Sequence, residues 1–325
     1  MTFQNETKMK SFPIENIQAK PAIEYDGIPS IEIEVLLSDG SLGSARERLN
    51  GIDISTAIAT VNEKIVGELV GEDASRQFQI DSLLKEIDGT TDFSHLGKSI
   101  IFPISMAVSR AAATSAGLSL YQYLGGVRSI YLPTPLFTAL SGRKNDQRWD
   151  IFIFSANNKD LSKGIENCRL ALESIKSQTS ITSYTEDYEK AFKTIKKLLT
   201  ESLDFTDINV GILRKEGNNE PDQYKEKGRI NENFNLLIKD NDILSTYCYG
   251  TVSDMFTYTR KFFGRPMIIK PNSGFHGSET FATDFAVAIQ ADYLKLESFT
   301  DWTTLHHLNR LLSIGSDLLL VNDVL

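Results

Sequence analysis

The residues from Ile100 to Gly117 form an apolar run that carries a single charge, Arg110. A helix that is apolar almost all round has to be surrounded by protein, because any face left in water would expose apolar side chains. Pro103 falls near the start of the run, where a missing backbone N–H is tolerated. We therefore expect a central helix over this run, with the neighbouring elements packed around it.

The segments before this run have the patterns of a hairpin and of amphipathic helices. Residues 31–37, IEIEVLL, alternate as in a half-buried strand, and a Ser-Asp-Gly turn leads into a second short run that returns beside the first. Apolar residues recur at helical spacing from Ile54 to Leu69, and Asp53 is placed to cap that helix. These patterns predict a small α+β domain at the amino terminus.

The segment Leu132-Pro133-Thr134-Pro135 is extended, because helix is disfavoured before proline. We place a domain boundary there, which gives one domain over residues 1–132 and a second over residues 133–325. Beyond the boundary, short apolar runs alternate with amphipathic helical patterns. This alternation is typical of parallel strands joined by helical crossovers, so we expect the second domain to be α/β.

Composition and charge exclude several classes of protein. The formal net charge is −9 and the pI is about 5.1, so nucleic acid is not an expected partner. No apolar run approaches the roughly 20 residues needed to span a bilayer, and the polar start lacks the apolar stretch of a secretory signal. We expect a cytoplasmic protein with no membrane partner, in which Cys168 and Cys248 are reduced and buried.

Three stretches resemble the enolase (phosphopyruvate hydratase) family. Residues 83–124 are similar to the enolase amino-terminal domain, and Leu132 to Pro135 are similar to the family's LPVP. Residues 283–314 contain TDFAVA, YLK and LNRLLSI, similar to the family's ADLAVA, QIK and NQLLRI. The resemblance implies an α+β domain followed by a TIM-like α/β barrel, a dimer, and magnesium-dependent dehydration of 2-phosphoglycerate. The second part of the chain is shorter than the roughly 200–250 residues of a complete barrel, so we expect a truncated one.

Several active-site parts that the resemblance implies are missing or replaced in this sequence. Enolases hold magnesium with carboxylates from the strings SIEDP and GDD, and this sequence contains neither. The nearest counterpart of SIEDP, Met267 to Pro271, carries a lysine that would repel the ion. The long Gly/Ser-rich lid of the family is replaced by the short link over residues 43–51. We expect no metal site and no cofactor, with magnesium needed only if the chain is an enzyme.

The resemblance nevertheless indicates candidate site residues. The family's phosphate loop, SHRSGE, lies over residues 270–275, which makes Asn272, Ser273 and Gly274 candidates for substrate binding. The family's strand lysine persists as Lys295, and Lys270 is a second candidate catalytic lysine. If Lys270 is the base, the phosphate alignment is wrong. Lys295 could equally be an inherited lysine in a salt bridge with Glu297, and the glycine-rich loop a plain connection between a strand and a helix.

Two hypotheses for function follow. The first is an enolase-like pseudoenzyme with a binding or regulatory role, which pairs as a homodimer or as a heteromer with another enolase-like or unrelated protein. The alternative is an enolase-superfamily carbon–oxygen lyase acting on a phosphorylated or carboxylate substrate, with Lys270 and Lys295 as base and electrostatic stabiliser. Residual 2-phosphoglycerate dehydration belongs to this alternative. Converging acids at the strand ends would favour an enzyme, and a Lys295 with no cavity above it would favour the pseudoenzyme.

Overall fold

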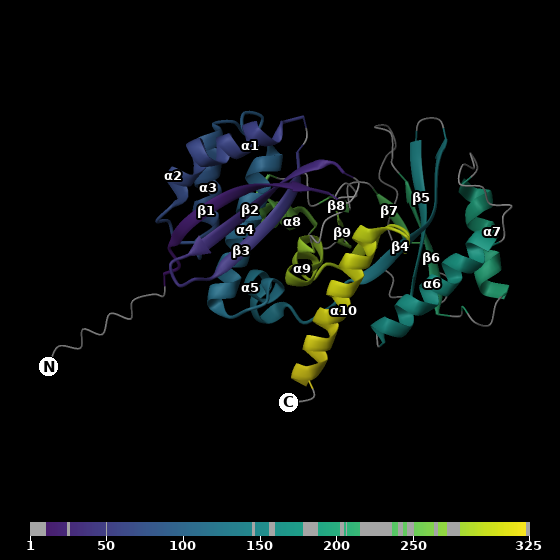
Figure 1. Ribbon diagram of the computed structural model, residues 1–325. Coiled ribbons are helices and arrows are strands. Elements are labelled where there is room, and N and C mark those ends of the chain that lie inside the picture. Colours follow the sequence, from purple (N-terminus) through teal and green to yellow (C-terminus); the bar gives the residue numbers. More distant parts are fainter. Residues whose placement is uncertain are drawn as a thin grey trace. The chain divides into compact units, whose positions relative to one another are not determined.

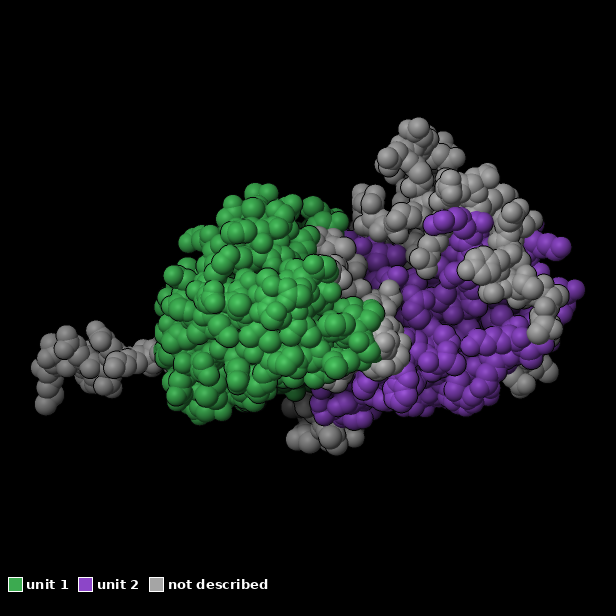
Figure 2. All heavy atoms as spheres, turned by 45° about the horizontal axis from the view of Figure 1, so that its top comes forward, with its two compact units in different colours: residues 1–129, 246–261, 272–289 green, residues 130–245, 262–271, 290–325 purple. Residues whose placement is uncertain are grey.

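The computed structural model describes most of the chain as two compact units (Figures 1 and 2). The described residues are 11–24, 27–49, 51–144, 147–155, 160–177, 188–201, 205, 207–214, 236–239, 243–245, 250–262, 266–271 and 280–322. Unit 1 comprises residues 1–129, 246–261 and 272–289, and unit 2 comprises residues 130–245, 262–271 and 290–325. Within the described residues, no helix is both long and apolar enough to cross a membrane.

Unit 1 contains a three-stranded antiparallel sheet in the order β1-β2-β3. The expected hairpin is confirmed as β2 (Pro29–Leu37) and β3 (Leu42–Arg48), which pair antiparallel. A further strand that the sequence pattern does not predict, β1 (Ile14–Ile23), pairs antiparallel with β2 at the edge of the sheet. Pro21 lies within this strand, and an edge strand tolerates a residue that cannot donate to the ladder.

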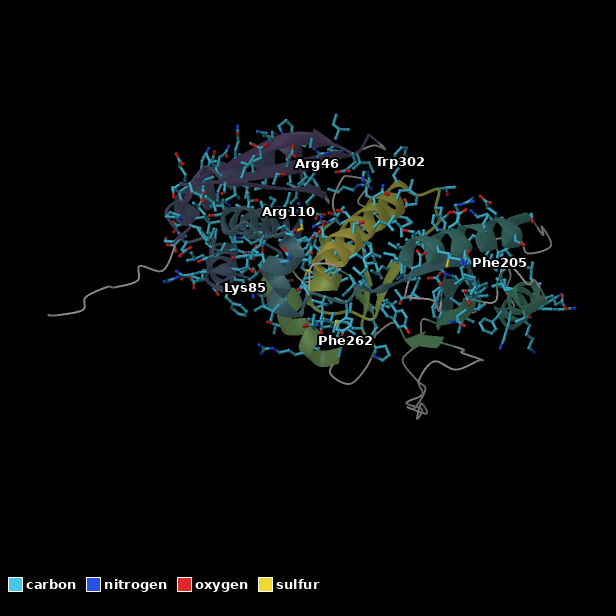
Figure 3. The ribbon with its side chains drawn as sticks, turned by 90° about the horizontal axis from the view of Figure 1, so that it is seen from below. Arg46, Lys85, Arg110, Phe205, Phe262 and Trp302 are labelled. Carbon is cyan, nitrogen blue, oxygen red and sulfur yellow. The ribbon has the colours of Figure 1, made fainter. Side chains whose placement is uncertain are left out.

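The helix α4 (Lys98–Ala116) is the buried centre of unit 1, as the apolar run predicts. It packs on the sheet at Gly43, where a Cβ would lie 2.2 Å from the Ala107 carbonyl oxygen. Its one charged residue, Arg110, donates from Nη1 to the Ser44 carbonyl oxygen at 2.6 Å; Arg110 is labelled on α4 in Figure 3. The single charged side chain of the helix therefore supplies a hydrogen-bond donor to a backbone carbonyl group of the sheet.

The other helices of the amino-terminal segment follow their predicted positions. The helical pattern from Ile54 to Leu69 forms α1 (Ile54–Thr60) and α2 (Val66–Leu69), joined by the π-helical turn η1 (Val61–Ile65). Asp53 caps α1, because its side chain accepts from the Thr56 amide. The segment ends with α3 (Gln77–Asp88), α4, α5 (Leu120–Gly125) and the 3₁₀ turn η2 (Gly126–Arg128).

Two helices from much later in the chain belong to unit 1, which the expected division into residues 1–132 and 133–325 does not include. They are α8 (Val252–Thr259) and α9 (Phe281–Ala288). Every residue of α9 is buried, and the Phe281 ring meets the Phe102 ring of α4 edge-on at 5.8 Å. Burial of this apolar surface explains why the late segments fold with the first 129 residues.

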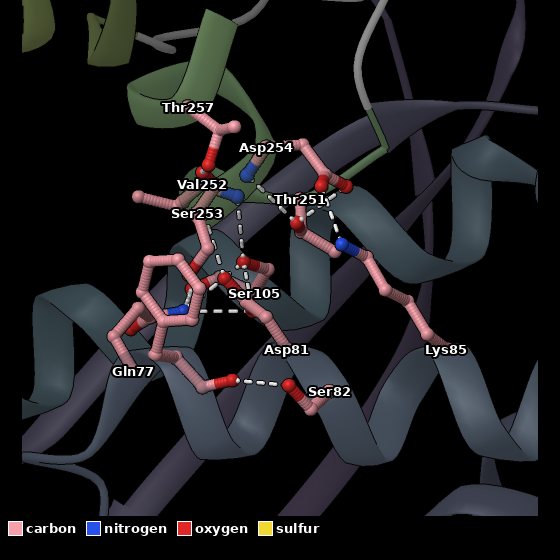
Figure 4. Close-up of polar contacts among 11 residues, drawn as sticks. Gln77, Asp81, Ser82, Lys85, Ser105, Thr251, Val252, Ser253, Asp254 and Thr257 are labelled. Atoms are coloured by element: carbon pink, nitrogen blue, oxygen red, sulfur yellow. Dashed lines mark hydrogen bonds and ion pairs between the residues drawn. The ribbon is translucent and has the colours of Figure 1, made fainter. Parts of the chain in front are cut away.

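A buried polar network connects α8 to α3 and α4, and Figure 4 shows it in close-up. The first amides of a helix have no partners within the helix. Here the Val252 amide donates to Ser105 Oγ at 3.0 Å, and the Ser253 amide donates to Asp81 Oδ2 at 2.9 Å. Ser105 Oγ also donates to Asp81 Oδ1 at 2.6 Å, and Gln77 Nε2 donates to the same oxygen at 3.0 Å. Side chains of α3 and α4, far from α8 in the sequence, thus supply hydrogen-bond acceptors for the first amides of α8.

Unit 2 is built on a seven-stranded mixed sheet in the order β7-β6-β5-β4-β10-β9-β8. The strands, in chain order, are β4 (Thr134–Lys144), β5 (Gln147–Ser155), β6 (Ile208–Arg214), β7 (Leu236–Lys239), β8 (Ile243–Ser245), β9 (Ile268–Lys270) and β10 (Tyr293–Leu296). The helices are α6 (Leu161–Ser177), α7 (Tyr188–Glu201) and α10 (Trp302–Asn322), and the 3₁₀ turn η5 (Arg260–Phe262) crosses the boundary between the units.

The strand directions agree only in part with the parallel arrangement that the alternating pattern predicts. β4, β10, β9 and β8 run parallel to one another, as do β6 and β7. β5 is antiparallel to both of its neighbours, β4 and β6. Only residues 145 and 146 separate β4 from β5, too few for a crossover. The fold is thus a small antiparallel-sheet domain and an α/β region with a mixed sheet.

Candidate functional site

The strand lysine Lys295 is almost completely buried in β10, where its side chain is 1% exposed. Three oxygen atoms surround its Nζ: Thr138 Oγ1 at 3.2 Å, Asp150 Oδ2 at 3.3 Å and Glu297 Oε1 at 3.5 Å. The contact with Thr138 is a hydrogen bond, and the contacts with Asp150 and Glu297 are ion pairs. We call Lys295, Thr138, Asp150, Glu297 and Lys270 the lysine cluster.

Neighbouring strands place the partners of Lys295. Thr138 lies in β4, which pairs directly with β10, and its hydroxyl donates to the Leu296 carbonyl oxygen at 3.1 Å. Asp150 lies in β5, and its side chain is 5% exposed. Its second oxygen accepts from the Ser141 hydroxyl at 2.6 Å. The buried carboxylate is therefore matched by one cation and one hydroxyl donor, as buried charges require.

Lys270 and Glu297 form the more open side of the lysine cluster. Lys270 ends β9, and its Nζ lies 3.7 Å from Glu297 Oε1, the same oxygen that approaches Lys295. The side chains of Lys270 and Glu297 are 27% and 34% exposed. Lys270 is the last residue of β9 and Glu297 directly follows β10, so both lie at the carboxyl ends of parallel strands, the edge at which α/β sheets bind ligands. The structure thus brings Lys270 and Lys295 together through a shared carboxylate.

The remaining predicted site residues lie outside the described part of the chain. Asn272, Ser273 and Gly274, the candidates for phosphate binding, fall within residues 272–279, which the structure does not describe. Cys248 is also outside the described residues. Cys168 is buried in α6 as a free thiol, and burial raises its pKa to about 12. A thiol with that pKa is inert as a nucleophile at neutral pH.

Asp150 and Thr138 are site residues that the sequence patterns do not predict. Asp150 directly precedes the apolar run Ile151 to Phe154, which we used only to predict a strand. A charged residue next to a buried apolar run indicates a site residue, because a buried charge requires an oppositely charged or hydrogen-bonding partner. The ion pair between Lys295 and Glu297, the alternative interpretation of this lysine, is present.

The chemistry open to the lysine cluster depends on how its charges are arranged. Two lysines alternate with two carboxylates, so the charges of the cluster balance. Among the described residues there is no group of three or more His, Cys, Asp or Glu side chains that could hold a metal ion. The cluster as it stands is a set of ion pairs between strands, with its exposed side at Lys270 and Glu297.

Comparison with known proteins matches the amino-terminal part of the chain. A model of the enolase N-terminal domain matches residues 43–124. The enolase of Campylobacter jejuni subsp. doylei is 38% identical over 148 residues, which cover 40% of this chain and 36% of the relative. Enolase 1 of Lactococcus lactis subsp. cremoris is 40% identical over 148 residues and 35% of its own length. The chain thus spans little more than a third of the relatives it matches.

The part of unit 1 that runs from β3 through the buried helix α4 is therefore the part that matches an enolase-type domain. The amino-terminal part of the chain is thus similar to the enolase N-terminal domain. The matched residues 43–124 extend from β3 to the end of α5. They do not include the lysine cluster.

Proposed function

We propose that this chain is an enolase relative without phosphopyruvate hydratase activity, whose role is to bind another molecule. The observation that carries the proposal is the position of Lys295, the counterpart of a lysine that the resemblance places in the enolase active site. Its ammonium group is buried and has three protein oxygens within 3.5 Å. Two carboxylates already neutralise this buried ammonium group, so it is poorly placed to stabilise further negative charge on a substrate.

Losses in the sequence support the same proposal. The strings SIEDP and GDD, which supply magnesium ligands in the family, have no match, and the lid is replaced by a short link. Electrostatic stabilisation is often the largest single contribution to catalysis, and removal of one stabilising group can cost about 2.7–4 kcal/mol. Several such losses together would reduce the rate to near that of the uncatalysed reaction.

The test is turnover of 2-phosphoglycerate by the purified chain in magnesium buffer, followed through the absorbance of the enolpyruvate product. The Campylobacter jejuni enolase in the same buffer is the positive control. We expect no turnover above the rate without protein. A rate close to that of the control enzyme would refute the proposal, and calorimetric titration with magnesium would then show whether the metal binds.

The alternative function is a lyase of the same superfamily, acting on a phosphorylated or carboxylate substrate. The observation that favours it is the partial exposure of Lys270 and Glu297 at the carboxyl ends of β9 and β10. In this case Lys270 would act as the base and Lys295 as the electrostatic stabiliser, and Asn272, Ser273 and Gly274 would contact the substrate. For 2-phosphoglycerate as the substrate the same assay distinguishes the two, because the lyase would show turnover that replacement of Lys270 by alanine abolishes.

We also propose that unit 2 derives from an enolase barrel that has lost part of its wall. The support comes from strand order: β4 and β10, the first and last strands of unit 2, pair in parallel as they would in a closed barrel. β7 and β8 are the two ends of the sheet among the described strands. We propose that the chain works in the cytosol, and that it pairs with itself or with another protein, which the mass of the purified protein in solution would test.

A further inference from the structure

Unit 1 contains a hollow of about 590 Å³ that belongs to neither the lysine cluster nor the sheet. It is bordered by the end of α3, the following turn, the start of α4, and the later segment of α8 and η5. Pockets for small ligands have volumes of about 300–1,000 Å³, so this hollow is large enough for a small metabolite. Lys85, at its edge on α3, is labelled in Figures 3 and 4.

The charges around the hollow are unusual for a chain with a net charge of −9. Lys85, Lys98 and Lys261 line it together with Asp92 and Asp254. Both carboxylates are already engaged: Asp254 is ion-paired with Lys85, and Asp92 accepts from the Ser94 amide at 3.2 Å. Three lysines against two aspartates leave the hollow positive, and a positive hollow favours a negatively charged occupant.

Hydroxyl and aromatic groups complete the lining of the hollow. Thr90, Thr257 and Tyr258 bring hydroxyl groups to it, and the Thr90 and Thr257 hydroxyls donate within the chain, to Asp88 Oδ2 and to the Ser253 carbonyl oxygen. Lys261 Nζ lies 4.3 Å from the centroid of the Tyr258 ring, so this ammonium is directed across an aromatic face that borders the hollow. Lys98 is the first residue of α4, and the amino-terminal end of a long helix adds a favourable potential for an anion.

The wall of the hollow is held in a strained conformation. Phe93 lies in the left-handed region at φ 59, which is uncommon for a bulky residue. Its ring is pressed against Gly250, where a Cβ would lie 2.2 Å from Cε2 of Phe93. Strain of this kind costs about 1–3 kcal/mol and persists where the surrounding structure imposes it, often at ligand sites. The turn that contains Phe93 therefore packs closely against Gly250, just before α8, at the wall of the hollow.

We propose that this hollow binds a phosphate group, either as free phosphate or as a small phosphate ester. Lys98 and Lys261 supply the charge that would attract the phosphate. The site lies outside the lysine cluster and outside residues 272–279, where the family resemblance would place a phosphate. The proposal does not depend on turnover of 2-phosphoglycerate.

The test is calorimetric titration of the full chain with inorganic phosphate and with ribose 5-phosphate, at low ionic strength because salt screens exposed charges. The variant is Lys98→Gln/Lys261→Gln. The matched control is Lys64→Gln/Lys163→Gln, which removes the same charge at two exposed lysines that are not part of the hollow. We expect the first variant to bind at least about tenfold more weakly than the unmodified chain, and the control to bind within about twofold of it.

Tighter binding of the ester than of free phosphate would identify the ester as the preferred ligand, and equal binding would identify phosphate itself. No measurable heat with either probe would overturn the proposal. Equal binding by the unmodified chain and the Lys98/Lys261 variant would also overturn it, because the phosphate would then bind elsewhere. An equal loss in the control pair would show a general charge effect and would count against the site. Circular dichroism of each variant confirms that the fold is retained.

Discussion

Lys295 and Asp150 form a buried ion pair, so each charge depends on the other for its stability. Replacement of Lys295 by methionine would remove the Lys295 ammonium group from beside the buried Asp150 carboxylate, which also accepts from the Ser141 hydroxyl. Breaking a buried pair from one side costs about 3–5 kcal/mol. We expect Lys295→Met to lower the free energy of unfolding by about this amount, as measured by urea denaturation.

The matched variants for this prediction come from the same lysine cluster. Lys295→Met/Asp150→Leu removes both charges, and we expect it to be more stable than the single variant, because no buried charge is left unpaired. Lys270→Met changes a lysine that is partly exposed, and we expect a loss below about 1 kcal/mol. If Lys295→Met were as stable as the unmodified chain, the ion pair would not carry the structural role that we assign to it.

At the scale of elements, the start of α8 depends on one buried carboxylate. Asp81 accepts from Ser105, Gln77 and the Ser253 amide, and its replacement by alanine would leave these donors without an acceptor. Loss of a charged acceptor for buried donors costs about 1.5–3 kcal/mol. We expect Asp81→Ala to lower the free energy of unfolding of unit 1 by at least this amount. Glu86→Ala, at an exposed position of the same helix, should change it by less than about 0.5 kcal/mol.

The pH dependence of this effect follows from burial, which raises the pKa of Asp81 above its ordinary value of 3.8. An acid whose pKa is raised by folding contributes its full stability below the unfolded value and loses it as the pH rises through the folded value. The difference in stability between the unmodified chain and Asp81→Ala should therefore be larger near pH 3.8 than at neutral pH. A difference that grew with increasing pH would contradict this account.

The elements that the sequence predicts are those whose signals are local. The apolar run of α4 and the cap at Asp53 need no information from the rest of the chain. β1 was missed because Pro21 and the polar residues of its pattern weaken the strand signal. The reversed direction of β5 follows from its short link to β4. The alternation of apolar runs with helical patterns predicted parallel strands instead, because it does not take the length of this link into account. The partners of Lys295 come from β4, from β5 and from the residue after β10, and no spacing in the sequence specifies such contacts.

At the scale of the whole molecule, unit 1 is discontinuous, so the amino-terminal domain should not be stable when it is cut from the rest. A fragment of residues 1–130 would lack α8 and α9 and expose the surfaces that they cover, among them the Phe102 ring. At Gly125, a Cβ would lie 2.3 Å from the Ala288 carbonyl oxygen, so α5 is also fitted to α9. We expect the fragment to unfold without a cooperative transition, as measured by thermal circular dichroism.

The control for this prediction is the full chain under the same conditions, which should show a cooperative transition. Exposed apolar surface can be detected independently by a fluorescent dye that binds it, and we expect the fragment to bind more dye than the full chain. A fragment that melted as sharply as the full chain and bound no dye would show that the first 130 residues are complete without the later helices.

The late arrival of α9 has a consequence for synthesis on the ribosome. Domains generally fold as units while the chain emerges, with the amino-terminal one first. Here the first unit stays incomplete until Ala288 has left the exit tunnel, and all of the strands before β10 have been translated by then. During that interval the nascent chain would present an unsealed apolar surface, which makes it a natural client for a chaperone that holds unfinished polypeptides.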